Sequence, residues 1–163
     1  MERRSDMPQG GIERAISIEH MTVRPDRVIA DVRVGDERFA YTTPTLIAEA
    51  LGRFPHLLRH TCINDKGPTF SAVANSTALP HLLEHMVIEE QVRLDGRESA
   101  SYVGKTSWTD RRRLRARVEV SYADDLVALQ AFKTAQEWLD DVLCDARRSS
   151  AAQLRRYAAD AET

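Results

Sequence analysis

One short run, His81-Leu82-Leu83-Glu84-His85, brings together the side chains of this chain that are best suited to chemistry. Histidines four residues apart on a helix project from the same face, and two neutral imidazoles at that spacing can bind one Zn²⁺. Glu84 lies beside them on the same side, where it can take a proton from a metal-bound water. This HxxEH order reverses HExxH and is related to an inverted zinc hydrolase signature. The run therefore predicts a zinc hydrolase, with Glu84 as base and His81 and His85 as metal ligands.

The ordinary alternative is that both histidines are structural and that Glu84 pairs with one of them. A glutamate at this spacing favours metal binding over that alternative. A catalytic zinc ion also needs a third protein ligand, with water in the fourth position. Glu89 follows one turn later, and the helix rise places its Cα about 12 Å from that of His81. We therefore interpret Glu89 as a partner that supports a ligand, or as a substrate contact.

The third ligand must come from another part of the chain, and the sequence does not choose it. For Cys62, a place in the hydrophobic core is favoured over a role as ligand. The candidates that stay open are His60, Cys62, Asp124, Asp125, Asp160 and Glu162.

The elements that must position these residues can be read from hydrophobic periodicity. The motif helix, expected over 78–94, is apolar on two sides, which indicates a central helix whose histidine face forms the floor of a cleft. Strands are expected at 12–20, 27–34, 37–41 and 113–122, with 27–41 as a hairpin, and helices at 44–52, 78–94 and 124–143. A last short helix is expected over 149–161. This order predicts an α+β, two-layer domain with an antiparallel sheet and helices packed on one face.

The length and composition fit one soluble globular domain, since 42% of the 163 residues are hydrophobic and 29% are charged. A net charge of −2 gives no general attraction to nucleic acid or to a membrane surface. Two cysteines provide no disulfide framework, and we expect a cytoplasmic location. We expect a disordered lead-in over 1–11, a single domain over 12–145 and a polar helical tail over 146–163.

Two weaker signals lie outside the motif. Gly104-Lys105-Thr106 is similar to the end of a phosphate-binding loop, but the first glycine of that loop is missing, so we reject a P-loop. An arginine-rich stretch accompanies the strand expected at 113–122, and a solvated face is favoured there over a surface that binds an acidic polymer. Its members are Arg111, Arg112, Arg113, Arg115 and Arg117.

The motif and the residues before it resemble the N-terminal domain of cyanophycin synthetase. That domain has a similar P-x-x-L-x-x-H-x-C run, then a glycine and a phenylalanine, and then H-x-x-E-H-x-x-x-E-x-Q. The resemblance spans most of 50–143 and is carried by Pro55, Leu58, His60, Cys62, Gly67, Phe70, His81, Glu84, His85, Glu89 and Gln91. HxxEH is also the motif of pitrilysin-type peptidases and of S-ribosylhomocysteine lyase, which share a related α+β metallohydrolase fold.

The resemblance implies binding of a multi-Arg aspartate polymer, and in some members its hydrolysis at a zinc site. The sequence lacks the ATP-grasp and ligase domains of the synthetase, so we do not expect polymer synthesis. Two functions are therefore considered. One is a zinc-dependent hydrolase of peptide or isopeptide bonds, and the other is a non-catalytic module that binds the polymer or a protein. We also expect a homodimer, formed through the strand face of Arg113, Arg115 and Arg117 and through the tail from Ser149 to Ala161.

Overall fold

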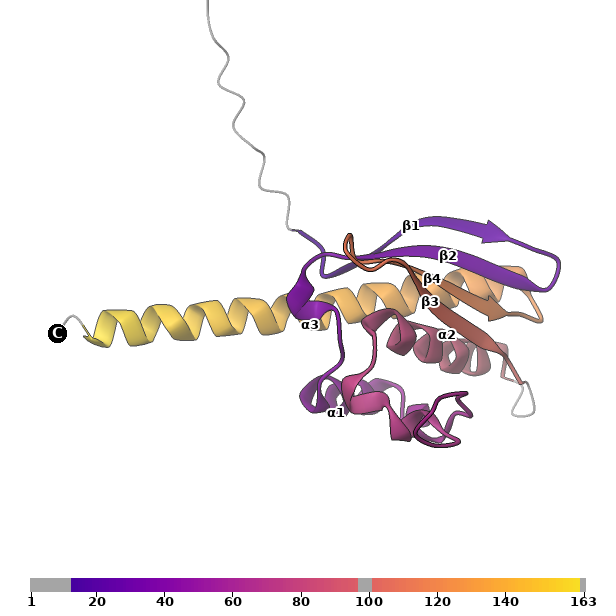
Figure 1. Cartoon of the computed structure of the whole chain (residues 1–163), viewed down its shortest axis with the longest axis horizontal. Coiled ribbons are helices and arrows are strands. Elements are labelled where there is room, and N and C mark those ends of the chain that lie inside the picture. The colour runs from indigo at the N-terminus through magenta and orange to yellow at the C-terminus, as the bar shows by residue number, and fades with distance from the viewer. Residues whose placement is uncertain (1–12, 97–100, 162–163) are drawn as a thin grey trace, which may run out of the picture.

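The computed structural model describes residues 13–96 and 101–161 of the chain, so the expected lead-in over 1–11 lies outside the described residues. Its main layer is a four-stranded antiparallel sheet in the order β1-β2-β4-β3 (Figure 1). Valine and alanine alternate with polar residues along β2 and β4, so each strand presents one apolar face and one solvated face. The strands are β1 (Ile16–Val23), β2 (Arg27–Val34), β3 (Gly104–Asp110) and β4 (Arg115–Ser121).

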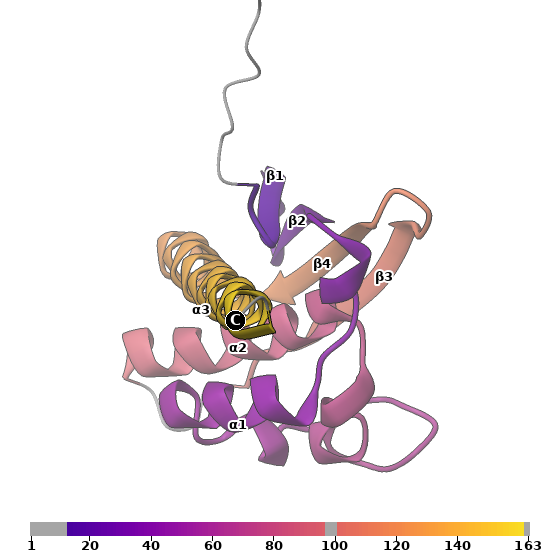
Figure 2. The same ribbon diagram turned by 90° about the vertical axis from the view of Figure 1, so that its left-hand side faces the viewer.

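Helices α2 (Leu79–Asp95) and α3 (Asp125–Ala161) cover the apolar face of the sheet. Helix α1 (Pro44–Arg53) lies on the far side of α2 from the sheet, as Figures 1 and 2 show. One continuous core joins the sheet to the three helices. This arrangement confirms the α+β prediction of an antiparallel sheet with helices on one face. No helix in the described part of the chain combines the length and apolarity needed to cross a bilayer.

Helix α2 is the central element of the fold, and it is buried around most of its circumference. Pro80 is tolerated in its first turn, where a backbone N–H has no helical partner, and Gly96 ends the helix with φ of 64°, in the left-handed region. Between α1 and α2 the chain forms three 3₁₀ turns: η2 (Leu57–Arg59), η3 (Phe70–Ala72) and η4 (Ala74–Ser76). These turns place the 54–76 segment against the N-terminal half of α2.

The strand predicted at 37–41, and with it the hairpin over 27–41, is wrong. Glu37–Phe39 form a 3₁₀ turn, η1, in which Asp36 accepts a hydrogen bond from the backbone N–H of Arg38. Tyr41 makes only an isolated bridge, with Ala78. The physical reason is that β1 and β4 already pair with both edges of β2, which leaves no edge of β2 for 37–41 to join as a hairpin partner.

Two further elements differ from the prediction. The chain forms a strand, β3, at Gly104–Asp110, where none was predicted. Helix α3 does not stop near residue 143 but continues to Ala161, so the short helix expected over 149–161 is the end of α3. From Asp145 to Ala161 every residue is exposed, and this part of α3 projects beyond the body of the domain (Figure 1).

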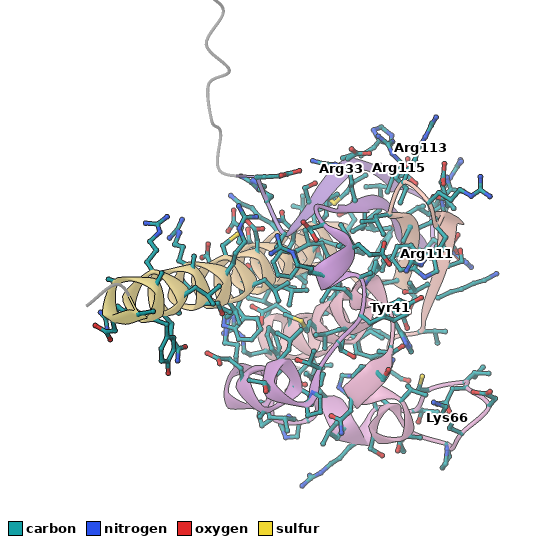
Figure 3. The ribbon with its side chains drawn as sticks, turned by 60° about the vertical axis from the view of Figure 1, so that its left-hand side comes forward. Arg33, Tyr41, Lys66, Arg111, Arg113 and Arg115 are labelled. Atoms are coloured by element: carbon teal, nitrogen blue, oxygen red, sulfur yellow. The ribbon has the colours of Figure 1, made fainter. Side chains whose placement is uncertain are left out.

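The outer face of the sheet carries arginines that are paired with acidic side chains. Arg33 and Arg115, which lie close together in Figure 3, both contact Glu19, at 3.3 Å and 2.9 Å. Arg117 contacts Asp31 at 3.2 Å. Because these exposed pairs balance one another and are worth little individually, the face is a solvated mixed-charge surface.

Candidate metal centre

Three side chains from two parts of the chain converge on one point and form a candidate metal centre. His81 and His85 come from successive turns of α2, and Cys62 comes from the loop that follows η2. One ligand atom from each lies within 4.8 Å of the others. Cys62 Sγ is 3.4 Å from His81 Nε2, which is 3.2 Å from His85 Nε2. The site therefore brings together a thiol and two imidazoles.

Neighbouring groups hold both rings so that Nε2 faces this point. His81 Nδ1 is engaged by the hydroxyl of Thr77 at 2.8 Å, and His85 Nδ1 by Nδ1 of His60 at 3.2 Å. The ring of Phe70 lies against both histidines, with centroid distances of 5.2 Å and 4.2 Å. Thr77 precedes the N-cap residue of α2, Ala78, and its hydroxyl orients a candidate ligand. A metal ligand whose second nitrogen is hydrogen-bonded is held in one orientation and one tautomer.

Burial sets the protonation of the three side chains. Desolvation is the main cause that lowers the pKa of His85 to about 3, with smaller effects of His81 and His60, and it also lowers the pKa of His81. Both imidazoles are therefore neutral near pH 7, as metal binding requires. Burial raises the pKa of the Cys62 thiol, so a metal entering the site would displace its proton. Neutral imidazoles with one thiolate are a donor set that suits zinc, and the residues present fit that ion.

Glu84 lies beside the three candidate ligands and is 4% exposed. Its Oε1 is 3.9 Å from His85 Nε2, and its Oε2 accepts a hydrogen bond from the Thr106 hydroxyl at 2.6 Å. Burial raises the pKa of Glu84 to about 7, although the Thr106 hydrogen bond acts in the opposite direction. A carboxyl group with a pKa near neutrality is suited to accept and return a proton at physiological pH.

Gly104 in β3 packs directly against Glu84. A Cβ atom at this position would lie 2.5 Å from both Cγ and Oε1 of Glu84, so only glycine leaves room for the carboxylate. We expect Gly104→Ala to displace the Glu84 carboxylate and to lower any turnover by about 100-fold, because a shift of about 1 Å at a reacting group costs that much. Zinc content should be unchanged. Assays of turnover and bound zinc on the same preparation test this.

The matched control for that variant is Gly52→Ala, since nothing lies within 4 Å of a Cβ atom at Gly52 in α1. It should retain turnover and gain up to about 1 kcal/mol of helix stability. Full turnover by Gly104→Ala would show that the position of Glu84 is not critical.

A cavity of about 960 Å³ opens over the candidate centre. Cys62, His81 and Glu84 form part of its lining, with Ile88 also contributed by α2. The rest of its wall comes mainly from β3 and the end of β4, including Tyr102, Lys105, Trp108 and Glu119. Arg111, which lies near Tyr41 in Figure 3, stacks over the rings of Trp108 and Tyr41, at 5.0 Å and 5.2 Å. The prediction that the histidine face of the motif helix forms the floor of a cleft is confirmed.

Comparison with known proteins gives one match. The family model of the cyanophycin synthase-like N-terminal domain matches residues 31–144, more than two thirds of the chain. The chain belongs to this family. No curated protein and no solved structure gives a significant match. The family match contains the whole candidate centre, whereas β1 and the projecting end of α3 lie outside it.

In this cyanophycin synthase-like domain, the other described residues that were predicted as site residues lie outside the group of Cys62, His81 and His85. His60 and Glu89 lie behind His85, where they contact each other rather than the point shared by the ligands. Asp124 caps α3 by accepting hydrogen bonds from the N–H groups of Leu126 and Val127. Asp125 and Asp160 are exposed on α3, and Glu162 lies outside the described residues. Of the third-ligand candidates among residues 13–96 and 101–161, only Cys62 joins the group with His81 and His85.

Proposed function

We propose that this domain is a zinc-dependent hydrolase of peptide or isopeptide bonds, and that its substrate is a multi-Arg aspartate polymer of the cyanophycin type. The observation that carries the proposal is the position of Glu84. A buried carboxyl group with a pKa near 7 lies 3.9 Å from a neutral His85 nitrogen that converges with His81 and Cys62. A purely structural pair would not need a thiol at that point or an open cavity above it.

The roles of the residues follow from their geometry. Cys62, His81 and His85 would hold the zinc ion, which when bound polarises the scissile carbonyl and acidifies the attacking water. Glu84 accepts the proton of that water and returns it to the leaving amine. Thr106 holds the Glu84 carboxylate at the cavity floor through its 2.6 Å hydrogen bond. The overall reaction adds water across one C–N bond and releases a carboxylate and an amine.

The free edge of β3 supports a substrate with an extended main chain. Ser121 N–H donates to Val103 C=O at 2.8 Å, which makes these opposed residues a hydrogen-bonded pair. Bonded and non-bonded pairs alternate along an antiparallel ladder, so Gly104, Thr106 and Trp108 point their backbone N–H and C=O groups away from β4. β3 has no strand neighbour on that side within residues 13–96 and 101–161. A peptide chain bound along this edge would pass in front of Glu84.

The charges of the cavity also suit the proposed polymer, which presents both carboxylates and guanidinium groups. Lys105, Arg27 and Glu119 contribute to the lining from the solvated face of the sheet, where Lys105 and Arg27 carry positive charge and Glu119 carries negative charge. Arg27 and Glu119 contact each other at 3.1 Å, so a zwitterionic ligand could exchange partners with this pair. The family match to cyanophycin synthase-like domains favours the same substrate class.

The experiment is an amine-release assay on three forms of the protein: as purified, stripped by a chelator, and stripped and then reloaded with zinc. The substrates are a β-linked Asp-Arg polymer and an unmodified Arg-rich α-peptide. We expect release from the polymer by the first and third forms only. Polymer binding without release by any form would contradict the hydrolase proposal and favour the non-catalytic binding module.

The projecting end of α3 supports a proposal on assembly. Leu154 and Tyr157 are 69% and 65% exposed there, so the described part of the chain leaves most of these two side chains uncovered. We expect a homodimer in which a second copy buries these side chains. Light scattering at micromolar concentration should give the dimer mass, and deletion of residues 149–163 should give the monomer. A monomer mass for the full chain would contradict this expectation.

A further inference from the structure

A chain of contacts runs from His85 away from the candidate centre, and it is not explained by ligand binding alone. His85 Nδ1 is 3.2 Å from Nδ1 of His60, whose Nε2 is 3.6 Å from Oε2 of Glu89. Glu89 Oε1 accepts a hydrogen bond from the backbone N–H of His56 at 3.0 Å. Since Glu89 is one turn after His85 in α2, these contacts tie the helix to the η2 loop. We refer to them as the His85–His60–Glu89 relay.

The contact between the two imidazoles allows only two arrangements, because one nitrogen must carry hydrogen and the other a lone pair. In the first, His85 donates from Nδ1, its Nε2 keeps the lone pair that faces Cys62, and His60 carries its own hydrogen on Nε2. In the second, His60 donates from Nδ1, and the hydrogen of His85 sits on Nε2. Only the first arrangement leaves His85 able to bind a metal through Nε2.

Glu89 distinguishes between these arrangements. Its Oε2 is buried and makes no hydrogen bond with any residue that the structure describes, so it lacks a donor. His60 Nε2 at 3.6 Å is placed to become that donor after a small movement of either side chain. A hydrogen on His60 Nε2 stabilises the buried carboxylate, whereas a lone pair there would face another acceptor.

We propose that Glu89 is a positioning residue, which acts through His60 to fix the tautomer of His85 that leaves Nε2 free for a metal ion. The inference rests on the proposed metal site, but the tautomers can be observed without metal. It assigns to Glu89 a role distinct from that of a ligand or a base, since its carboxylate touches neither the ligand atoms nor the cavity.

Glu89→Gln is a direct test because the orientation of the new amide is determined. The His56 backbone N–H needs an acceptor, so the amide oxygen takes the place of Oε1 and the NH₂ group faces His60 Nε2. An NH₂ group can only donate, which forces the lone pair of His60 onto Nε2 and its hydrogen onto Nδ1. The hydrogen of His85 must then move to Nε2. The isosteric variant should therefore invert both tautomers and disfavour metal binding.

The experiment measures histidine tautomers by nitrogen NMR on metal-free protein, together with the zinc dissociation constant by calorimetric competition. We expect His85 to carry hydrogen on Nδ1 in the wild type and on Nε2 in Glu89→Gln, with zinc binding weakened by about 10–100-fold in the variant. The matched control is Glu49→Gln. It makes the same exchange at an exposed position of α1, far from the relay, so both readouts should stay as in the wild type.

Each outcome decides the inference. The same His85 tautomer in both proteins, or hydrogen on Nε2 in the wild type, would overturn it. If the wild type binds no zinc, but the His85 hydrogen still moves from Nδ1 in the wild type to Nε2 in Glu89→Gln, the result would contradict the proposed function and support the relay. If Glu89→Gln does not fold, His60→Phe serves instead, because it keeps the ring volume and removes the acceptor for His85 Nδ1. Unchanged zinc affinity in His60→Phe would overturn the inference.

Discussion

Replacing Glu84 by glutamine is expected to abolish measurable hydrolysis while leaving zinc and polymer binding nearly intact. Glutamine keeps the shape of the side chain and can still contact Thr106, but it cannot accept a proton from water. A positioned general base contributes about 10²–10⁴-fold to a rate, so the loss should be at least of that size. Turnover, zinc content and polymer affinity measured on one preparation would separate a loss of chemistry from a loss of binding.

One control variant and one variant with a predicted pH shift accompany this test. Glu49→Gln changes an exposed glutamate of α1 and should leave turnover unchanged. Thr106→Val removes the hydrogen bond that lowers the pKa of Glu84, so the pKa of Glu84 should rise further. Because a base acts only when deprotonated, the acidic limb of the turnover–pH profile should move to higher pH. Full activity in Glu84→Gln would remove Glu84 from the mechanism and with it the proposed reaction.

The elements that the sequence predicts well are those whose residues serve mainly the core. The motif helix carries a strong apolar pattern, with Pro80 at its start and Gly96 at its end, and its predicted and observed bounds agree closely. Strand β4 is predicted by its regular alternation of apolar and charged residues. Thr43, a residue type typical of helix N-caps, caps α1, and its hydroxyl accepts a hydrogen bond from the Leu46 N–H. Local chemistry determines each of these features.

Strand β3 escaped prediction because its inward-facing positions serve the candidate site. Gly104 and Thr106 face α2, but one makes room for Glu84 and the other hydrogen-bonds to it. Neither residue is a large apolar side chain, so the strand lacks the alternating hydrophobic pattern that identifies β4. Glycine and threonine two residues apart on a strand, opposite a predicted catalytic glutamate, are the signal that could have located this wall of the cavity.

Cys62 shows the other limit of prediction from one sequence. It lies in an irregular segment, and its position depends on contacts between residues distant in sequence from α2, such as the bridge between Thr61 and Thr69. The hydrophobic periodicity that identifies helices and strands gives no information about a residue in such a loop. Its burial is real, since Cys62 is 8% exposed, but its sulfur faces two histidines rather than apolar neighbours alone. The H-x-C pair of His60 and Cys62, followed by HxxEH, is the pattern that carries this information.

The proposed role of Cys62 as the third zinc ligand leads to the second large effect. Protein never exposed to chelator should contain about one zinc ion per chain, and Cys62→Ser should lose it, because a serine hydroxyl is a much weaker ligand for zinc than a thiolate. His81→Ala combined with His85→Ala should lose it as well. Cys144→Ser is the matched control, since Cys144 is the second free cysteine and lies on α3 outside the metal group. Metal analysis by mass spectrometry on each purified protein measures the ratio of zinc to chain.

The pH dependence of zinc affinity tests the same assignment independently of zinc content. The Cys62 thiol, whose pKa is raised by burial, holds its proton at neutral pH and must release it on binding, whereas burial keeps His81 and His85 already neutral. Release of one proton makes the affinity rise about tenfold for each pH unit between pH 6 and 8. Cys62→Ser should have a shallower slope, because only the neighbouring Glu84 carboxyl, with a pKa of about 7, still titrates in this range, while Cys144→Ser should keep the wild-type slope. A wild-type affinity that does not vary with pH in this range would exclude Cys62 as the third ligand, even if zinc is bound, because a thiol ligand must release its proton.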